Sequence, residues 1–322
     1  MPRIELHLHL EGGAPADFIR GLAAEQGVDL GRIFTGEGSY ACRDFTRLRR
    51  VQAATTSVLT SPEAYHRLTR AVLAESAAHG VIYTEAFLSP DACGNGDPVA
   101  WQEYLAAIQD AAARAQAQDG ITLRGIVTAH RHFGLDRAKA VALCAAETAG
   151  SFVRGFGIAG DGMAGKLRDF AWGFDCAREA GLHLTAHAGE RGGAPSVWEA
   201  LQILRVERIG HGVQAIDDPA LVDHLAESGT VLECCPGADI ALGLCPDWPG
   251  HPINQLRTAG VKVTVSTDAP PFFHTTMTVE YDRLAKTFGW DAAVFADITQ
   301  TALHAAFCDK DTRAALARKL EA

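Results

Sequence analysis

The alternation of short apolar runs with alanine-rich helical segments is the feature that most constrains how this chain can fold. Eight runs rich in aliphatic residues are expected to form strands: 3–10, 81–87, 121–128, 153–158, 182–186, 208–211, 231–235 and 261–267. Amphipathic segments with helical spacing lie between them, at 62–78, 99–118, 139–148, 166–179 and 220–227. Strands that alternate with helices in this way form parallel sheets, because each helix carries the chain back to the start of the next strand.

Two parallel architectures fit this pattern, an open doubly wound sheet and a closed (β/α)8 barrel. Open sheets of the nucleotide-binding kind carry a glycine-rich phosphate loop after the first strand. Here Glu11-Gly12-Gly13 does not match GxGxxG, and no GxxxxGK[ST] motif occurs. The sequence therefore predicts an α/β fold, a (β/α)8 TIM barrel.

Two additions to a minimal barrel are expected. A helical insertion follows strand 1 and includes the weakly patterned segment 29–43, and extra C-terminal helices are expected near 279–288, 291–307 and 312–320. No linker, repeat or low-complexity segment divides the chain. Residues 1–322 are therefore expected to form a single domain.

Composition limits the class of partner. The formal net charge of −10 is opposite to the basic surface that nucleic-acid binding requires, and it also disfavours anionic membranes. No apolar run approaches the ~18 residues of a membrane span. The eight cysteines show no CxxC pair, as expected for free thiols in a reducing compartment. Because no apolar leader precedes the first strand, we expect a cytoplasmic protein with a small substrate, and we infer no protein partner.

Histidines and one carboxylate at predicted strand ends indicate where chemistry occurs. His7 and His9 are two residues apart on the first strand, so both side chains point to the same face. Alone, this pair also fits a half-buried strand with two polar residues. However, His187, His211 and Asp268 follow three other strands, and strand ends of a barrel meet at one mouth. The three imidazoles and one carboxylate from strands 1, 5 and 8 suit zinc and leave a position for water, and His211 and Glu190 remain to support the ligands or to transfer protons.

Four motifs in this order and spacing resemble a known family. They are His-Leu-His-Leu-Glu-Gly from residue 7, His-Ala-Gly-Glu from 187, Arg-Ile-Gly-His-Gly from 208 and Ser-Thr-Asp-x-Pro from 266. Together they resemble the adenosine/adenine deaminase family of the amidohydrolase superfamily, over residues 3–307. The resemblance implies one Zn²⁺ per chain in a (β/α)8 barrel, and hydrolysis of a ring amine of a purine to a carbonyl with release of ammonia.

The resemblance also implies a role for each motif residue. The implied metal ligands are His7, His9, His187 and Asp268; the implied catalytic residues are Glu190, His211 and Asp268; the implied substrate-binding residues are His9, Glu11 and Gly160. Zinc lowers the pKa of its water toward ~7, and His211 orients that water. A carboxylic acid at Glu190 can protonate the ring nitrogen beside the reacting carbon and later the departing amine.

One position departs from the family pattern. The metal-binding aspartate of the family is usually followed by a second aspartate that bonds N7 of the purine, but here Ala269 follows. Losing one such contact costs on the order of 1–3 kcal/mol. Glu11 stands where adenosine deaminases often have aspartate, whereas glutamate is frequent in adenine and other purine deaminases.

Several substrates fit these residues. We place a purine nucleoside first, with adenosine or 2′-deoxyadenosine converted to inosine or 2′-deoxyinosine. The alternatives are adenine, another 6-aminopurine such as 6-aminodeoxyfutalosine, and a weakly active purine-binding protein that lacks the contact at Ala269. A non-catalytic protein that keeps its metal for stability, and an amide or ester hydrolase on the same barrel, are the rivals from other classes.

Other metal chemistries fit the sequence less well. Binuclear members of the superfamily usually need a carboxylated lysine at the end of strand 4, where this chain has residues 157–161 with no lysine. The P-C-x-x-C motif of cytidine-type zinc deaminases does not occur. A second His-x-His, at His130 and His132, is interpreted as a hydrogen-bonded loop pair near the mouth.

Overall fold

Eight parallel strands form one sheet, and each strand pairs with the next along the chain. The computed structural model describes residues 1–42 and 45–321. The strands are β1 (Arg3–His9), β2 (Val81–Leu88), β3 (Thr122–His130), β4 (Val153–Ala159), β5 (His183–Ala188), β6 (Arg208–His211), β7 (Val231–Cys234) and β8 (Lys262–Val265). Leu8 of β1 bridges to Asp268, three residues beyond β8, and so closes the sheet. The predicted barrel is confirmed.

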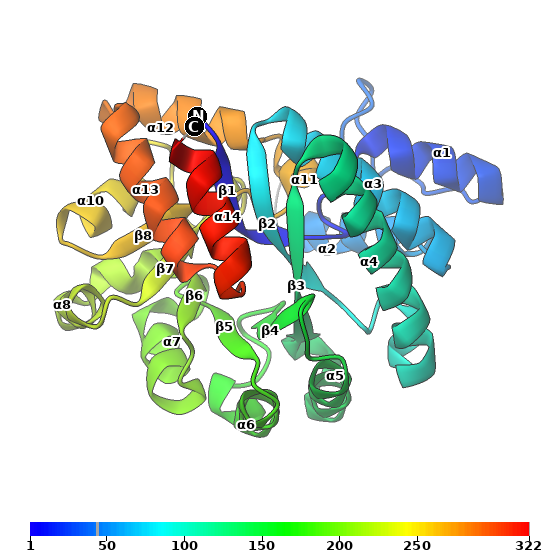
Figure 1. Ribbon diagram of the computed structural model, residues 1–322, viewed down its shortest axis with the longest axis horizontal. Helices are drawn as coiled ribbons and strands as arrows, with labels where there is room; N and C mark the ends of the chain where they lie inside the picture. The colour runs from blue at the N-terminus through cyan, green and yellow to red at the C-terminus, as the bar shows by residue number, and fades with distance from the viewer. Residues whose placement is uncertain (43–44, 322) are drawn as a thin grey trace.

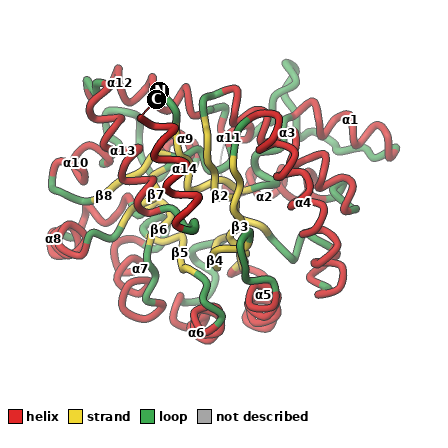
Figure 2. The backbone as a smooth tube through the Cα atoms, viewed as in Figure 1, coloured by secondary structure: helices red, strands yellow, loops and turns green. Residues whose placement is uncertain are grey.

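Helices form the outer layer around the strands, as Figure 1 and Figure 2 show. The α-helices are α1 (Ala16–Gln26), α2 (Phe45–Thr56), α3 (Pro62–Ala78), α4 (Pro98–Asp119), α5 (Leu135–Glu147), α6 (Ala171–Glu179), α7 (Gly193–Glu199), α8 (Pro219–Ser228), α9 (Pro236–Ala241), α10 (Ile253–Thr258), α11 (Pro270–Phe273), α12 (Met277–Phe288), α13 (Ala292–Ala305) and α14 (Lys310–Glu321). Shorter 3-10 or π turns are η1 (Gly94–Gly96), η2 (Arg131–Phe133), η3 (Leu167–Phe170), η4 (Ala200–Leu204) and η5 (Val213–Asp217). None of the helices in the described ranges combines the length and hydropathy that crossing a membrane requires.

Local signals explain why the helix bounds were predictable in some places and not in others. The Ser61 side chain accepts a hydrogen bond from the Ala64 N–H and Pro62 follows it, so α3 begins and ends where the sequence predicts. The segment predicted at 139–148 begins earlier, at Leu135. Leu135 is exposed, so the apolar periodicity of α5 does not extend to its first turn.

The segment between β1 and β2 contains the predicted helical insertion, made of α1 and α2 ahead of α3. Its connecting loop is tied to the barrel because the Tyr40 hydroxyl donates to the Ala14 carbonyl at 3.1 Å. Residue 43 of the weakly patterned segment lies outside the described residues. The insertion places α2 beside the C-terminal ends of the first strands, where it lines a cavity described below.

The other end of the barrel is closed by the C-terminal helices. Ile4 and Leu6 of β1 and Tyr83 of β2 pack against Leu303 of α13 and Leu316 of α14, all of them buried. The predicted extra C-terminal helices are therefore confirmed. Because they cover the N-terminal ends of the strands, the mouth formed by the C-terminal ends is the open side of the barrel.

Candidate metal centre and active site

The barrel is closed by a seam between β1 and Asp268, and this seam brings the predicted metal ligands together. The Asp268 N–H donates to the His7 carbonyl at 3.0 Å, and the His9 N–H donates to the Asp268 carbonyl at 2.8 Å. Asp268 Oδ1 consequently lies 3.3 Å from His9 Nε2 and 4.0 Å from His7 Nε2. His187 at the end of β5 completes the group, with its Nε2 atom 3.1 Å from His9 Nε2.

The chemistry of these four residues fits a divalent metal ion. His7 Nε2 and His187 Nδ1 are buried without a hydrogen-bond partner. Burial lowers the pKa of His9 to about 3 and the pKa values of His7 and His187 well below the usual range, so all three rings are neutral at pH 7. Burial also raises the pKa of Asp268 to about 7. Neutral imidazoles that converge on a buried carboxyl are the donors that zinc takes up.

Two residues of the site have strained backbones. Among the described residues that are not glycine, Asp268 has a φ of 63° and His211 a φ of 62°, both left-handed. Such conformations cost roughly 1–3 kcal/mol each and persist where the surroundings hold them, most often at functional sites. For Asp268, the hydrogen bonds of the seam with His7 and His9 hold the strained backbone.

A carboxylate and a second histidine hold His211 at the end of β6. Its Nδ1 donates to Asp239 Oδ1 at 2.9 Å, and the other Asp239 oxygen accepts from His251 Nε2 at 3.0 Å. His211 Nε2 lies 3.8 Å from Glu190 Oε1. Burial alone would lower the pKa of His211, but the carboxylates of Glu190 and Asp239 raise it to about 10.

The protonation of His211 separates it from the metal ligands. One nitrogen of His211 lies close enough to His7 and His187 to share an ion with them. A protonated imidazole has no lone pair to offer a metal, so the cationic form is not a ligand, and its Nε2 N–H is free to orient a water molecule instead. The structure thus brings Glu190 and His211 to the ligand cluster, where the sequence placed them.

Sequence reasoning missed Asp239 and His251. Asp239 lies in α9, shortly after β7, and a carboxyl near a strand end was a signal that could have found it. His251 lies in a loop before α10 and carries no comparable signal. Its contact with Asp239 exists only in the folded chain.

The predicted substrate-binding residues lie beside the ligand cluster. Glu11 is buried and accepts a hydrogen bond from the Tyr65 hydroxyl at 2.8 Å, and burial raises its pKa to about 7. Gly160 follows β4 with a φ of +95°, and a Cβ there would lie 2.6 Å from His132 Nδ1. Only glycine therefore fits, and it leaves the backbone open to the cavity.

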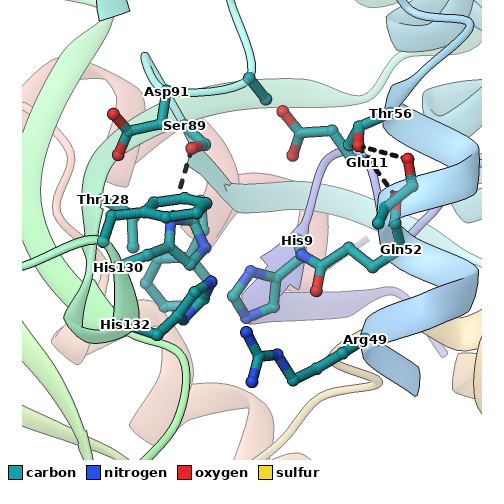
Figure 3. A pocket seen from close by; sticks show the side chains of 14 residues that line it. His9, Glu11, Arg49, Gln52, Thr56, Ser89, Asp91, Thr128, His130 and His132 are labelled. Atoms are coloured by element: carbon teal, nitrogen blue, oxygen red, sulfur yellow. Dashed lines mark hydrogen bonds between the residues drawn. The ribbon is translucent and has the colours of Figure 1, made fainter. Parts of the chain in front are cut away.

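Two adjoining cavities open at the mouth. The smaller, of about 80 Å³, is lined by Gly160, Glu190 and His211, with Ala269 and Phe272 on its apolar side. The larger has about 240 Å³. Figure 3 shows its walls, which include His9, Glu11, Arg49, Gln52, Ser89, Asp91, His130 and His132.

The second His-x-His pair lines both cavities. His130 is the last residue of β3 rather than part of a loop, because the strand runs two residues further than predicted. Its Nδ1 lies 3.4 Å from the Ser89 hydroxyl, whereas His132 Nδ1 is buried without a hydrogen-bond partner, so the expected hydrogen bonding is found for His130 alone. Neither His130 nor His132 belongs to a metal-binding group among the described residues.

Comparison with known proteins places the chain in a family. The family model described as adenosine deaminase matches residues 2–322. The chain belongs to the adenosine deaminase family. The adenine deaminase of Rhizobium leguminosarum bv. trifolii is 43% identical over 320 residues, with 99% of each chain covered. That of Agrobacterium fabrum is 42% identical over 320 residues, covering 99% of this chain and 97% of the relative.

Solved structures of the family match the fold. Adenine deaminase from Arthrobacter aurescens superposes with a TM-score of 0.89 at 26% identity, covering 99% of this chain and 98% of that one. A zinc-bound amidohydrolase from Burkholderia ambifaria superposes with a TM-score of 0.87 at 27% identity, covering 100% and 90%. The chain is therefore a deaminase, a hydrolase that acts on C–N bonds.

Proposed function

We propose that this protein is a zinc-dependent adenine deaminase that converts adenine and water to hypoxanthine and ammonia. The observation that carries the proposal is the convergence of His7, His9, His187 and Asp268 beside Glu190. The relatives named adenine deaminase, 40–43% identical over nearly the whole chain, support a purine deaminase. They support adenine, the alternative, better than the nucleoside that the sequence placed first.

The side chains divide the reaction between them. A divalent ion held by the four ligands would lower the pKa of a water molecule toward ~7. Glu190, as a neutral acid, donates a proton to the ring nitrogen beside the reacting carbon, which makes that carbon open to attack. His211, held by Asp239, orients the attacking oxygen through its Nε2 atom. Glu190 then takes up one proton of the water and delivers it to the amine as the C–N bond breaks, and the second proton of the water returns to Glu190 as the carbonyl forms.

The larger cavity favours a second candidate, a 6-aminopurine nucleoside. Adenine would occupy the small cavity beside Glu190 and leave about 240 Å³ next to it. Polar side chains of Glu11, Ser89 and Gln52 line that space and could bond sugar hydroxyls. The two candidates thus differ in whether this cavity holds part of the substrate.

Steady-state kinetics distinguishes the candidates. With zinc-loaded protein, we expect kcat/KM for ammonia release from adenine to exceed that for adenosine and 2′-deoxyadenosine by at least about tenfold. One well-placed hydrogen bond made by one substrate and missing in the other changes kcat/KM by about this factor. A preference for either nucleoside would replace adenine by the second candidate. No ammonia from any aminopurine would overturn the proposal.

Ala269 is expected to limit turnover. It is buried on the apolar side of the small cavity, between the metal ligand Asp268 and Pro270, and offers no hydrogen bond to a purine. Ala269→Asp is expected to raise kcat/KM for adenine about 5- to 150-fold, which corresponds to about 1–3 kcal/mol for one added polar contact. Ala269→Ser, which adds a shorter polar group, is the matched control and is expected to gain less. Equal or lower activity of the Asp variant would show that the purine does not lie against this wall.

A further inference from the structure

We infer that Glu233 is the positioning residue for the proposed metal ligand His7, and that a buried ion-pair network behind Glu233 ties the metal site to the opposite end of the barrel. The inference rests on the proposed metal-dependent function. It concerns three residues of the barrel interior, Glu233, Arg208 and Glu85, which have no part in the reaction steps described above.

The first step is the contact between Glu233 and His7. Glu233 lies in β7 and is fully buried, and its Oε2 accepts a hydrogen bond from His7 Nδ1 at 2.8 Å. A carboxylate on Nδ1 fixes the proton there and leaves the lone pair on Nε2. His7 Nε2 is the buried atom without a partner that faces Asp268. Glu233 thereby selects the ring form and orientation that a metal requires.

The second step is the support of Glu233 itself. Its other oxygen, Oε1, accepts from the Thr185 hydroxyl at 2.9 Å and from Arg208 Nε at 2.6 Å. Arg208 also donates through Nη2 to Glu85 Oε2 at 2.6 Å. Both oxygens of Glu233 are therefore hydrogen-bonded, Oε2 by a residue of β1 and Oε1 by residues of β5 and β6. These bonds prevent the carboxylate from rotating away from His7.

Arg208 joins the two carboxylates of this network. It lies between Glu85 and Glu233, and all three side chains are buried, so water does not screen these ion pairs. The Glu233 carboxylate on Nδ1 makes the His7 imidazole a stronger donor toward a cation bound at its far nitrogen.

The third step is the anchor at the bottom of the barrel. Glu85 Oε1 accepts from the Tyr83 hydroxyl at 2.6 Å and from the Phe307 N–H. The Arg208 guanidinium lies 3.5 Å from the centroid of the Phe307 ring. Phe307 follows α13, so the contacts run without a break from the C-terminal segment to His7 at the mouth.

Zinc affinity of the purified full-length chain tests this assignment. After metal depletion, Zn²⁺ is titrated in competition with a chromophoric chelator. Glu233→Gln is expected to weaken Zn²⁺ binding 10- to 100-fold, the usual effect of losing a hydrogen-bonded partner of a metal ligand. Glu280→Gln is the matched control, because Glu280 is an equally buried glutamate that bonds Thr275 and Gly237 instead. Its affinity for Zn²⁺ is expected to equal that of the unchanged chain.

A second readout separates positioning from general stability. A role limited to packing would lower Tm equally with and without Zn²⁺, whereas loss of positioning shrinks the rise in Tm that Zn²⁺ causes. If Glu233→Gln does not fold, Thr185→Val removes one hydrogen bond to Glu233 and keeps every charge, with an expected loss of about 2- to 10-fold in affinity. Unchanged Zn²⁺ affinity in a folded Glu233→Gln or Thr185→Val variant would overturn this inference and leave the proposed function standing. Failure of the unchanged chain to bind Zn²⁺ would overturn the proposed function with it.

Discussion

Glu190→Gln is expected to lower kcat for deamination of adenine by about 10²–10⁴-fold, the usual contribution of a general acid–base group. The amide has nearly the same shape as the acid but cannot give its proton to the ring and take it back. Glu190 is not one of the four proposed ligands, so metal content and KM are expected to stay close to those of the unchanged chain. Glu227→Gln, an exposed site on α8, is the control for the same chemical change.

The pH profile gives a second signature of Glu190. Burial raises the pKa of Glu190 above its usual value, so its neutral form persists to higher pH than in an exposed glutamate. The reaction uses the neutral acid, so kcat/KM is expected to fall as pH rises through this pKa. That alkaline decline is expected to be lost in the Gln variant. A variant that keeps full turnover would show that another group moves the proton.

His187→Ala is expected to abolish metal binding and to lower kcat for deamination at least 10³-fold. Metal assistance contributes several kcal/mol to catalysis, and each 1.4 kcal/mol is a factor of about ten in rate. The loss follows from geometry, since His187 comes from β5, on the opposite side of the barrel from β1, and its Nε2 atom lies 3.1 Å from His9 Nε2. Metal analysis and ammonia release are measured on the same preparation.

The control for this variant is His304→Ala, an exposed histidine at the end of α13, far along the chain from every ligand. Zinc content and turnover of that control are expected to match the unchanged chain. Retention of both zinc and turnover in His187→Ala would remove His187 from the ligand set and with it the proposed arrangement.

The fold could be predicted because its signals are local. Apolar runs separated by amphipathic segments identify parallel strands and helices, and caps such as Ser61 fix where a helix begins. The closing contact was not predictable in detail. It depends on Asp268 adopting a left-handed backbone conformation between His7 and His9, which the sequence does not reveal.

The site could be predicted where its residues follow strands, because a barrel brings all strand ends to one mouth. This rule identified His7, His9, His187 and Asp268, which do converge. It could not identify Glu233, whose role depends on which interior side chains meet across the barrel. The sequence placed a nucleoside ahead of adenine, and it could not test that order against the shape of the site, because both cavities are lined by α2 of an insertion with weak sequence patterning.

Anomalous X-ray diffraction at the zinc absorption edge, from crystals of the zinc-loaded chain, tests the proposed centre most directly. We expect one strong peak per chain, within about 2.0–2.2 Å of a nitrogen of His7, His9 and His187 and an oxygen of Asp268. The absence of a peak among these four side chains, or a peak held by other residues, would contradict the proposed site.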